Sequence, residues 1–424
     1  MREYLKEPKP STAEDKQQVQ QTVREVLAAI QEKGGAAVRS YSRQFDKWDP
    51  QSFRVSEAEI HAARKGCSAV FLDDLRFCQT QVREFAKRQM ETLSGFEVET
   101  HPGVILGQKL IPIQNSGSYV PGGRYPLVAS AHMSVITPKV AGVERVIACT
   151  PPTPEGQMYP NTLAAISEAG ADEIYSLGGI QALGAMAFGT EEIKHVDFIA
   201  GPGNRFVAEA KKQLFGVVGI DLLAGPSEVL VIADDSADPR IVAADLLAQA
   251  EHGLDSPAWL VTTSRALAEA VIADVERQLA TLATAAVAGV AWRDCGAVIL
   301  VDSYEEAAAI SDEYAPEHLE VQVRDLDFFF HRLRNYGSLF LGEHSTVAFS
   351  DKTIGTNHIL PTGKAARYTG GLSVLKFMKS VTYQRLTAEG ASLIAPICAR
   401  QCRIEGMIGH AVSCEVRAEK YGKA

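Results

Sequence analysis

The order of apolar and polar residues predicts helices in the first hundred residues. Val23, Leu27 and Ile30 recur at helical spacing and predict one helix that ends at a pair of glycines. A second helix is expected from Ala36, and residues 56–95 carry an intermittent apolar face of the same kind. Nothing in this part of the sequence indicates catalysis.

From about residue 111 the pattern changes to short apolar runs that alternate with helical segments. The runs are RVIACT, EIYSLGG, VDFIAG, EVLVIAD, AWLVTT and AVILV. Strands that alternate with helices predict βαβ units and parallel sheets. Two such units, at 119–226 and 227–371, predict two separate sheets, so the expected fold class is α/β with two Rossmann-like domains. After residue 372 helical patterns return, and we expect this tail to pack on another subunit.

Composition narrows the classes of function. A net charge of -10, with no block of Lys and Arg, argues against a nucleic-acid partner. The amino terminus lacks the apolar core of a signal peptide, and no run of about 18 apolar residues could span a membrane. We therefore expect a cytoplasmic protein that acts on a small molecule. The seven cysteines form no CxxC pair, which is typical of reduced thiols, and no chemistry is assigned to them.

Three glycine-rich turns follow predicted strands, at 117–126, 176–186 and 200–210. In the last of them, GPGN leads into a helix whose first amides could face an anion such as a cofactor phosphate. The third glycine of the dinucleotide fingerprint is missing, so a tight βα turn is an equally good interpretation of this turn alone. Three such turns in one unit favour a nucleotide site.

An amide and an imidazole stand in the apolar stretch AQAEHGLDS. Gln249 and His252 are three positions apart, so on a helix their side chains share one face. This spacing is used for metal ligation, although a core histidine satisfied by a neighbouring amide is the simpler interpretation of one such pair. Other acid and base groups lie in Pro- and Gly-bounded segments, where functional residues concentrate. These candidates are Glu317, His318, Asp351, His358 and, five residues after Glu405, His410.

These residue types favour metal chemistry over the common hydrolytic and phosphoryl-transfer mechanisms. No P-loop or HExxH motif occurs, and Ser227 is not in a GxSxG elbow. Gln, His and Asp side chains would hold Zn²⁺, Mn²⁺ or Co²⁺ without thiolates, as an open catalytic site does.

Seven motifs then occur together and in order. They are GPGNRFVAEAK, AGPSEVLVIAD, QAEHG, APEHLE, GSLFLGE, GTNHILPTG and EGMIGHA. Through them the chain resembles the histidinol dehydrogenase family over nearly its whole length. The resemblance implies a homodimeric enzyme that depends on Zn²⁺ and NAD. Such an enzyme oxidises a primary alcohol through an aldehyde to a carboxylate and reduces two NAD molecules.

The resemblance also implies roles for individual residues. The metal ligands would be Gln249, His252, Asp351 and His410, and the NAD contacts would be Tyr119, Gln181 and Asn204. The catalytic pair would be Glu317 and His318. Substrate contacts would be Ser227, His358 and Glu405, together with the metal ligands and Glu317. His410 and Glu405 would reach the site from the partner subunit.

We expect the chain to divide into four parts. These are an extension at 1–17, a first α/β domain formed by 18–118 and 227–371, an NAD-binding α/β domain at 119–226, and a helical dimerisation segment at 372–424. The first α/β domain is expected to carry most of the metal-binding and catalytic residues.

The sequence departs from enzymes specific for histidinol. Ala129 stands where those enzymes carry a serine, His132 replaces an apolar residue, and Lys376 stands where an acidic residue is common. These stretches are more similar to the sulfopropanediol dehydrogenase branch, whose substrate is a sulfonate anion. The candidate donors to such an anion are Arg124, His132, Lys364, Arg367 and Lys376.

Two alternatives remain open on the sequence alone. Glu405 is retained, and a carboxylate near the substrate would suit the cationic amine of histidinol. A relative that binds zinc or nucleotide without catalysis is a third possibility. The intact pair Glu317 and His318 argues against it, because a binding module does not need an acid–base pair.

Overall fold

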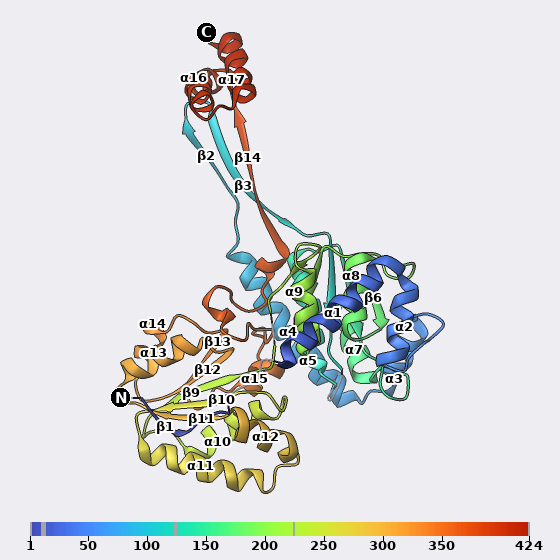
Figure 1. Ribbon diagram of the computed structural model, residues 1–424, viewed down its shortest axis with the longest axis vertical. Coiled ribbons are helices and arrows are strands. Elements are labelled where there is room, and N and C mark those ends of the chain that lie inside the picture. The colour runs from blue at the N-terminus through green and yellow to red at the C-terminus, as the bar shows by residue number, and fades with distance from the viewer. Residues whose placement is uncertain (1, 10–13, 123–125, 224, 423–424) are drawn as a thin grey trace.

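Two helix-covered sheets form the body of the protein, and a long thin arm ends in a pair of helices (Figure 1). The computed structural model describes residues 2–9, 14–122, 126–223 and 225–422. Among these residues, none of the helices combines the length and the apolar character needed to cross a membrane.

The first sheet has the strand order β1-β11-β10-β9-β12-β13. Its strands are β1 (Glu3–Lys6), β9 (Val229–Ala233), β10 (Ala258–Thr262), β11 (Ala297–Leu300), β12 (His318–Gln322) and β13 (Ser338–Leu341). All the pairings are parallel except that of β1 with β11. Every residue of β9 and β12 is buried, which is expected of central strands covered on both faces.

The second sheet has the order β6-β5-β4-β7-β8 and is wholly parallel. Its strands are β4 (Asn115–Tyr119), β5 (Arg145–Thr150), β6 (Glu173–Ser176), β7 (Phe198–Ala200) and β8 (Gly219–Ile220). In both sheets the first strand of the parallel set lies in the middle, between the second and the fourth. The predicted α/β class with two parallel sheets is confirmed.

Helices cover both sheets. Those of the first sheet are α10 (Pro239–Ala250), α11 (Arg265–Leu279), α12 (Ala285–Cys295), α13 (Tyr304–Tyr314), α14 (Leu326–Arg332), α15 (Val347–Lys352) and the short η2 (Ala365–Arg367). Those of the second sheet are α1 (Glu14–Lys33), α2 (Gly35–Phe45), α3 (Glu57–Gly66), α4 (Ala69–Glu91), α5 (Val128–Ala131), η1 (His132–Ile136), α6 (Thr137–Ala141), α7 (Pro160–Ala169), α8 (Gly179–Phe188), α9 (Arg205–Leu214) and η3 (Val374–Phe377).

The predicted grouping of 18–118 with 227–371 differs from the packing. Helix α1 packs on α8 and α9, and its buried Val23 and Ile30 share one core with Leu183 and Met186 of α8. Helices α3 and α4 pack on α7 and α6 of the same domain. The apolar face of this segment was read correctly, but periodicity does not say which sheet the face covers.

The predicted extension at 1–17 contains a strand of the first sheet. Strand β1 pairs antiparallel with β11, with Glu3 opposite Leu300. Residues 14–17 already belong to α1, so the chain passes from one domain to the other within this segment.

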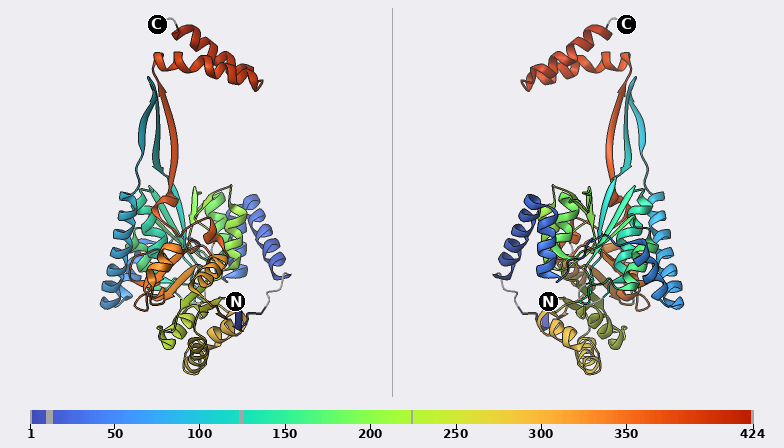
Figure 2. Two further views of the ribbon diagram at one scale, coloured as in Figure 1. Left: turned by 90° about the vertical axis from the view of Figure 1, so that its left-hand side faces the viewer. Right: turned by 90° about the vertical axis from the view of Figure 1, so that its right-hand side faces the viewer.

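The arm consists of β2 (Phe96–His101), β3 (Val104–Pro112) and β14 (Met378–Leu386), followed by α16 (Ala388–Ile404) and α17 (Ile408–Tyr421). Strand β14 pairs antiparallel with β3 along its whole length, and β2 pairs with the other edge of β3. The prediction that 372–424 is helical is therefore wrong for its first part. Figure 2 shows the helix pair held far from both domains at the end of this ribbon.

Candidate active site

The predicted catalytic residues lie where strands of the first sheet begin. His318 opens β12, and Glu228 directly precedes β9, the neighbouring strand. The second domain closes one side of this region, because Ser130 Oγ lies 3.3 Å from His358 Nε2. The structure thus brings Glu317, His318, Ser227 and His358 to one edge of the first sheet, beside the second domain.

His318 has the geometry of a general base. Its Nδ1 lies 3.0 Å from the carbonyl oxygen of Glu228 and donates a hydrogen bond to it. The other ring nitrogen, Nε2, is buried without a protein partner. Burial lowers the pKa of His318 to about 4, although the Asp351 carboxylate opposes the shift. The imidazole is therefore neutral near pH 7, and its free lone pair is on Nε2.

Glu317 is held beside His318 by backbone contacts. Its Oε2 accepts a hydrogen bond of 2.9 Å from the Glu228 amide and lies 3.5 Å from His318 Nδ1. Burial raises the pKa of Glu317 well above its usual value, and the Glu228 and Asp351 carboxylates raise it further. Hydrogen bonds from the Glu228 amide and from the Ser227 side chain oppose this shift.

The amide of Gln249 is the clearest sign of a missing ligand. Its Oε1 and Nε2 are both buried without a partner, in a residue that is only 1% exposed. Helix α10 ends at Ala250, but His252 N donates to Gln249 O at 3.2 Å, so the helical spacing of the two residues continues through the turn. A buried amide without partners is costly unless something binds it.

Two of the other predicted metal ligands meet here. His252 Nε2 lies 3.9 Å from Asp351 Oδ2. Burial opposes the ionisation of Asp351, but the charges of His358, His318, Lys352 and His252 hold its pKa below the usual value. His358 donates from Nδ1 to the Asp351 carbonyl oxygen at 3.0 Å. An ionised carboxylate, an imidazole and an unsatisfied amide fit a divalent cation with nitrogen and oxygen ligands.

Glu405 and His410 do not reach this region within one chain. Glu405 caps the end of α16 and His410 lies on α17, and both are exposed at the tip of the arm (Figure 1). Their roles at the site remain predictions that require a second copy of the chain.

Of the predicted anion donors, Arg124 lies outside the described residues, while Arg367 donates to the Glu313 carbonyl oxygen and Lys376 to Thr369 Oγ1. Gln79 Nε2 donates to His132 Nδ1 at 3.2 Å and also to the Ala165 carbonyl oxygen. Burial, with a contribution from His358, lowers the pKa of His132 to about 3. The ring is therefore neutral and offers a sulfonate no positive charge.

The predicted NAD contacts lie where the strands of the second sheet end, whereas the predicted catalytic residues lie where the strands of the first sheet begin. Tyr119 ends β4 and accepts a hydrogen bond of 3.1 Å from Gly179 N. Gly201 follows β7 with φ of 124°, and a Cβ there would collide with the Tyr119 carbonyl oxygen. Strands β4 and β7 flank the point where the strand order reverses, which is where such sheets bind nucleotides.

Gln181 and Asn204 have intramolecular partners in this structure. Gln181 Nε2 donates to Asp46 Oδ2 at 2.7 Å, while its buried Oε1 has no partner. Asn204 caps α9 by accepting from the amides of Phe206 and Val207. The cap orients the first turn of α9 toward the crevice, which suits a bound phosphate.

A buried ion pair braces the GPGN turn. Lys211 of α9 pairs with Asp221, and both side chains are almost fully buried. Lys211 Nζ also donates to Gly201 O at 2.9 Å, and Asp221 Oδ2 accepts from Gly201 N at 2.8 Å. The Lys211–Asp221 pair therefore holds both the amide and the carbonyl group of Gly201 in place.

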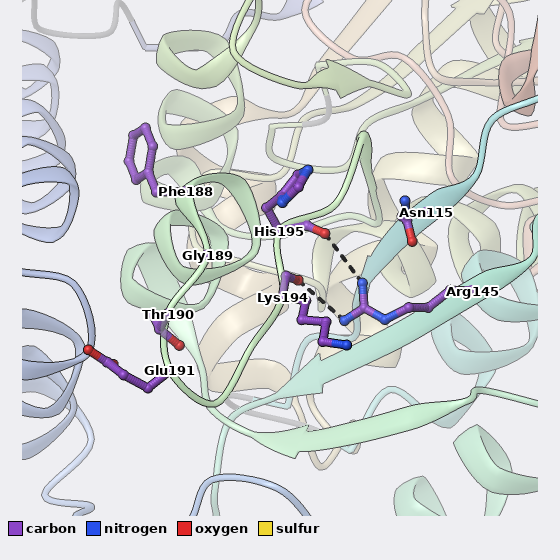
Figure 3. A pocket seen from close by; sticks show the side chains of 8 residues that line it. All are labelled: Asn115, Arg145, Phe188, Gly189, Thr190, Glu191, Lys194 and His195. Atoms are coloured by element: carbon purple, nitrogen blue, oxygen red, sulfur yellow. Dashed lines mark hydrogen bonds between the residues drawn. The ribbon is translucent and has the colours of Figure 1, made fainter.

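A surface depression on the second domain is not part of the site. Figure 3 shows it beside the beginning of the strands, where Asn115 and Arg145 start β4 and β5. Arg145 donates to the Lys194 and His195 carbonyl oxygens and to Glu173. Its guanidinium anchors a loop and is not available for an anion.

Sequence reasoning missed three polar side chains of the site. Glu228 holds His318 and Glu317 through its backbone, and burial raises the pKa of its own carboxyl to about 7. Lys352 Nζ lies 3.7 Å from Asp351 Oδ2. Asp46 holds Gln181. Glu228 and Lys352 are direct neighbours of predicted residues in the chain, whereas Asp46 lies in the stretch FDKWDP, which resembles the sulfopropanediol branch but was assigned no role.

The site combines a neutral, buried imidazole with side chains that suit a divalent cation. It faces a domain whose strand order is typical of nucleotide binding. Together these features are typical of an oxidoreductase. A model of the histidinol dehydrogenase family matches residues 9–418. The chain therefore belongs to the histidinol dehydrogenase family. It is an NAD-dependent oxidoreductase that acts on CH–OH groups, and the cofactors of this family are NAD and Zn²⁺.

Individual relatives are similar over their full length. A histidinol dehydrogenase homolog of Shouchella clausii is 53% identical over 100% of both chains. Sulfopropanediol 3-dehydrogenase of Ruegeria pomeroyi is 50% identical, which covers 99% of this chain and 97% of the relative. The crystal structure of histidinol dehydrogenase from Elizabethkingia anophelis is 37% identical, with a TM-score of 0.91 over 98% of this chain and 95% of that one.

Replacing Lys211 by Met tests the brace under the GPGN turn. The change leaves Asp221 buried without its counter-charge, and breaking a buried pair in this way costs about 3–5 kcal/mol. We expect the free energy of unfolding, measured by urea denaturation, to fall by this order, and NAD affinity to fall as well. Lys212→Met is the control, because Lys212 is the exposed neighbour and should change neither quantity. Unaltered stability and NAD affinity in Lys211→Met would contradict the brace.

Proposed function

We propose that the protein oxidises a primary alcohol through an aldehyde to a carboxylate, with its active site shared between two subunits. The substrate we favour is (R)-2,3-dihydroxypropane-1-sulfonate, which would give (R)-3-sulfolactate. One observation supports the chemistry best. The Gln249 amide and His318 Nε2 are both buried without a hydrogen-bond partner in the protein, on one edge of a sheet.

The residues present fit a zinc ion. Gln249, His252 and Asp351 would hold it from one subunit, and the partner subunit's His410 would complete the set. When bound there, Zn²⁺ orients the substrate and polarises its hydroxyl group. Glu251, which accepts a hydrogen bond from Thr284 Oγ1 at 2.7 Å, is a supporting carboxylate and not a ligand.

His318 is the base in both oxidation steps. Its Nε2 accepts the hydroxyl proton as hydride leaves the carbon, and the Glu228 carbonyl oxygen stabilises the ring by accepting from Nδ1. NAD, when bound in the crevice of the second domain, takes up the hydride. Tyr119 and the turn after β7 shape that crevice.

Glu317 activates water in the second half of the reaction. Water adds to the aldehyde, and the hydrate then loses hydride and a proton to give the acid. Overall, one alcohol, two NAD⁺ and one water yield one carboxylate, two NADH and three protons. The backbone amide of Glu228 holds Glu317 in place throughout.

Charge near the site supports the sulfonate. Lys352 is close to Asp351, and Lys364 is close enough to Glu228 to lower the pKa of that carboxyl. Both lysines are exposed and can offer a positive charge to an anion, whereas the His132 ring cannot. The identity of 50% to a sulfopropanediol 3-dehydrogenase, against 42–43% to three histidinol dehydrogenases, supports the same choice.

Histidinol is the second candidate substrate. The observation that favours it is Glu405, whose carboxylate would pair with an ammonium group if the partner subunit delivers it. The third alternative is a relative that binds zinc or nucleotide without catalysis. It does not account for the oriented and buried imidazole of His318.

The arm supports a homodimer. Apolar side chains are exposed along it, including Phe96, Val98, Ile397, Ile404, Ile408 and Val416. An exposed apolar surface of this extent is typical of an interface. A second copy of the chain would cover it and would bring Glu405 and His410 toward a neighbouring site.

His318→Asn tests the base. The expected loss in kcat is about 10²- to 10⁴-fold, the usual contribution of a general base. Bound zinc should remain near the wild-type level by mass spectrometry, because His318 is not among the proposed ligands. Loss of the metal in this variant would mean that His318 is a ligand and not the base.

Kinetics on the two alcohols test the substrate. We expect kcat/KM for the sulfonate to exceed that for histidinol by at least about tenfold, because one charged hydrogen bond contributes about 1.5–3 kcal/mol. Lys364→Met should lower the value for the sulfonate, and Lys379→Met, an exposed change on the arm, should not. A preference for histidinol would overturn the choice of substrate but not the oxidation chemistry.

Subunit complementation tests the shared site. His318→Asn and His410→Ala should each be nearly inactive as homodimers. Co-expressed, they should recover about a quarter of wild-type activity, because half of the dimers are mixed and each of these has one intact site. The absence of recovery in a confirmed mixed dimer would show that His410 does not act across the interface.

A further inference from the structure

Three cysteines of the terminal helix pair lie together. Cys398 and Cys402 of α16 and Cys414 of α17 have Sγ atoms within 4.8 Å of one another. Within the described residues, no other group of three or more His, Cys, Asp and Glu side chains brings its ligand atoms this close. The cluster lies on the helix pair of the arm (Figure 2), and none of its three cysteines is among the proposed ligands or catalytic residues of the active site.

The packing of the two helices builds this cluster. Cys398 and Cys402 are four positions apart and share one face of α16. Small buried side chains, Ala399 on α16 and Ala411 on α17, allow the helices to approach closely. The ion pair of Arg403 with Glu415 links the helices a short distance away.

The sulfur spacing matches that of metal ligands. Cys398 Sγ and Cys402 Sγ are 3.9 Å apart. A Zn–S bond of about 2.3 Å places tetrahedral sulfur ligands about 3.8 Å apart. A disulfide between these two residues is excluded, because Cβ atoms at this helical spacing are about 5–6 Å apart, whereas a disulfide needs about 3.5–4.5 Å.

The surroundings also suit a cation held by thiolates. Cys402 is buried, while Cys398 and Cys414 are half-exposed and line a pocket with Arg417 and Tyr421, which gives an ion a route of entry. Hydrogen bonding with Cys398, together with burial, raises the pKa of Cys414 to about 11. The Cys414 thiol is therefore protonated near pH 7, and metal binding would release its proton into solvent.

We propose that Cys398, Cys402 and Cys414 bind one thiophilic metal ion with a filled d shell, such as Zn²⁺ or Cu⁺. Three S–H bonds lose their protons as three metal–sulfur bonds form. With Zn²⁺ the complex carries one negative charge, and the nearby Arg417 partly balances it. The ion ties α16 to α17 across the turn between Glu405 and His410, and its consequence for these two residues rests on the proposed function.

The metal content of the full-length protein tests the site. Protein prepared with a reductant and excess Zn²⁺, then freed of loose metal, should contain two zinc ions per subunit by mass spectrometry. Cys414→Ser and Cys398→Ser should each contain one, and so should His252→Ala, which lacks the other site. Cys295→Ser is the matched control, since it removes a half-exposed thiol outside the cluster and should keep two ions.

Spectroscopy distinguishes the two sites. After replacement of zinc by Co²⁺, the thiolate ligands should give a sulfur-to-cobalt charge-transfer band. The band should persist in His252→Ala and disappear in Cys414→Ser, with both variants folded by circular dichroism. A band that is absent in the wild type, or unchanged in both cysteine variants, would overturn the proposal. Peptide mapping that finds Cys414 in a disulfide in the reductant-treated protein would overturn it too. Loss of zinc only in His252→Ala would support the active site and refute the thiol site.

Discussion

Buried polar groups that the chain leaves unsatisfied determine the character of the active site. Each such group costs about 1–3 kcal/mol, and Gln249 alone has two of them beside His318 Nε2. The surrounding structure holds these groups in place, because every residue of β12 is buried and His318 donates a hydrogen bond to the Glu228 carbonyl oxygen. A cation at the Gln249 amide oxygen and a hydroxyl proton at Nε2 would each offset part of it. These groups are thus the ones that the proposed ligands would satisfy.

The two domains use opposite edges of similar sheets. The nucleotide site proposed for the second domain lies where β4 and β7 end, as expected for this strand order. In the first sheet the equivalent position is filled by its own side chains, since Asp234 accepts hydrogen bonds from Tyr304 and from Arg324 N. The site lies instead where β9 and β12 begin, at the edge toward which the antiparallel helix α10 delivers Gln249. This placement lets one domain present the base and the other the hydride acceptor.

The sequence predicted the helices and strands better than it predicted how they pack together. The apolar periods found α1 and all six of the strand runs, and the motifs selected Glu317, His318, Gln249 and Asp351 for one site. Periodicity shows which face of α1 is buried, but it does not identify the covering sheet, so the domain grouping was wrong. Strands β2 and β3 were missed because both faces are largely exposed within one chain, which removes the apolar alternation that predicts a strand. The neutrality of His132 depends on burial, which the sequence does not give.

The same exposure supports the proposal that the arm packs on a second subunit. A narrow ribbon of β2, β3 and β14 with water on both faces buries little apolar surface, and small isolated sheets are marginal in water. Among the described residues, no other element makes an extensive contact with the ribbon between the domains and the helix pair (Figure 1). Its apolar side chains gain a solvent-excluded environment only from another molecule. The predicted site residues Glu405 and His410 lie at the end of this ribbon, so in the proposed dimer the stability of the arm and the completeness of the site would depend on the same contact between subunits.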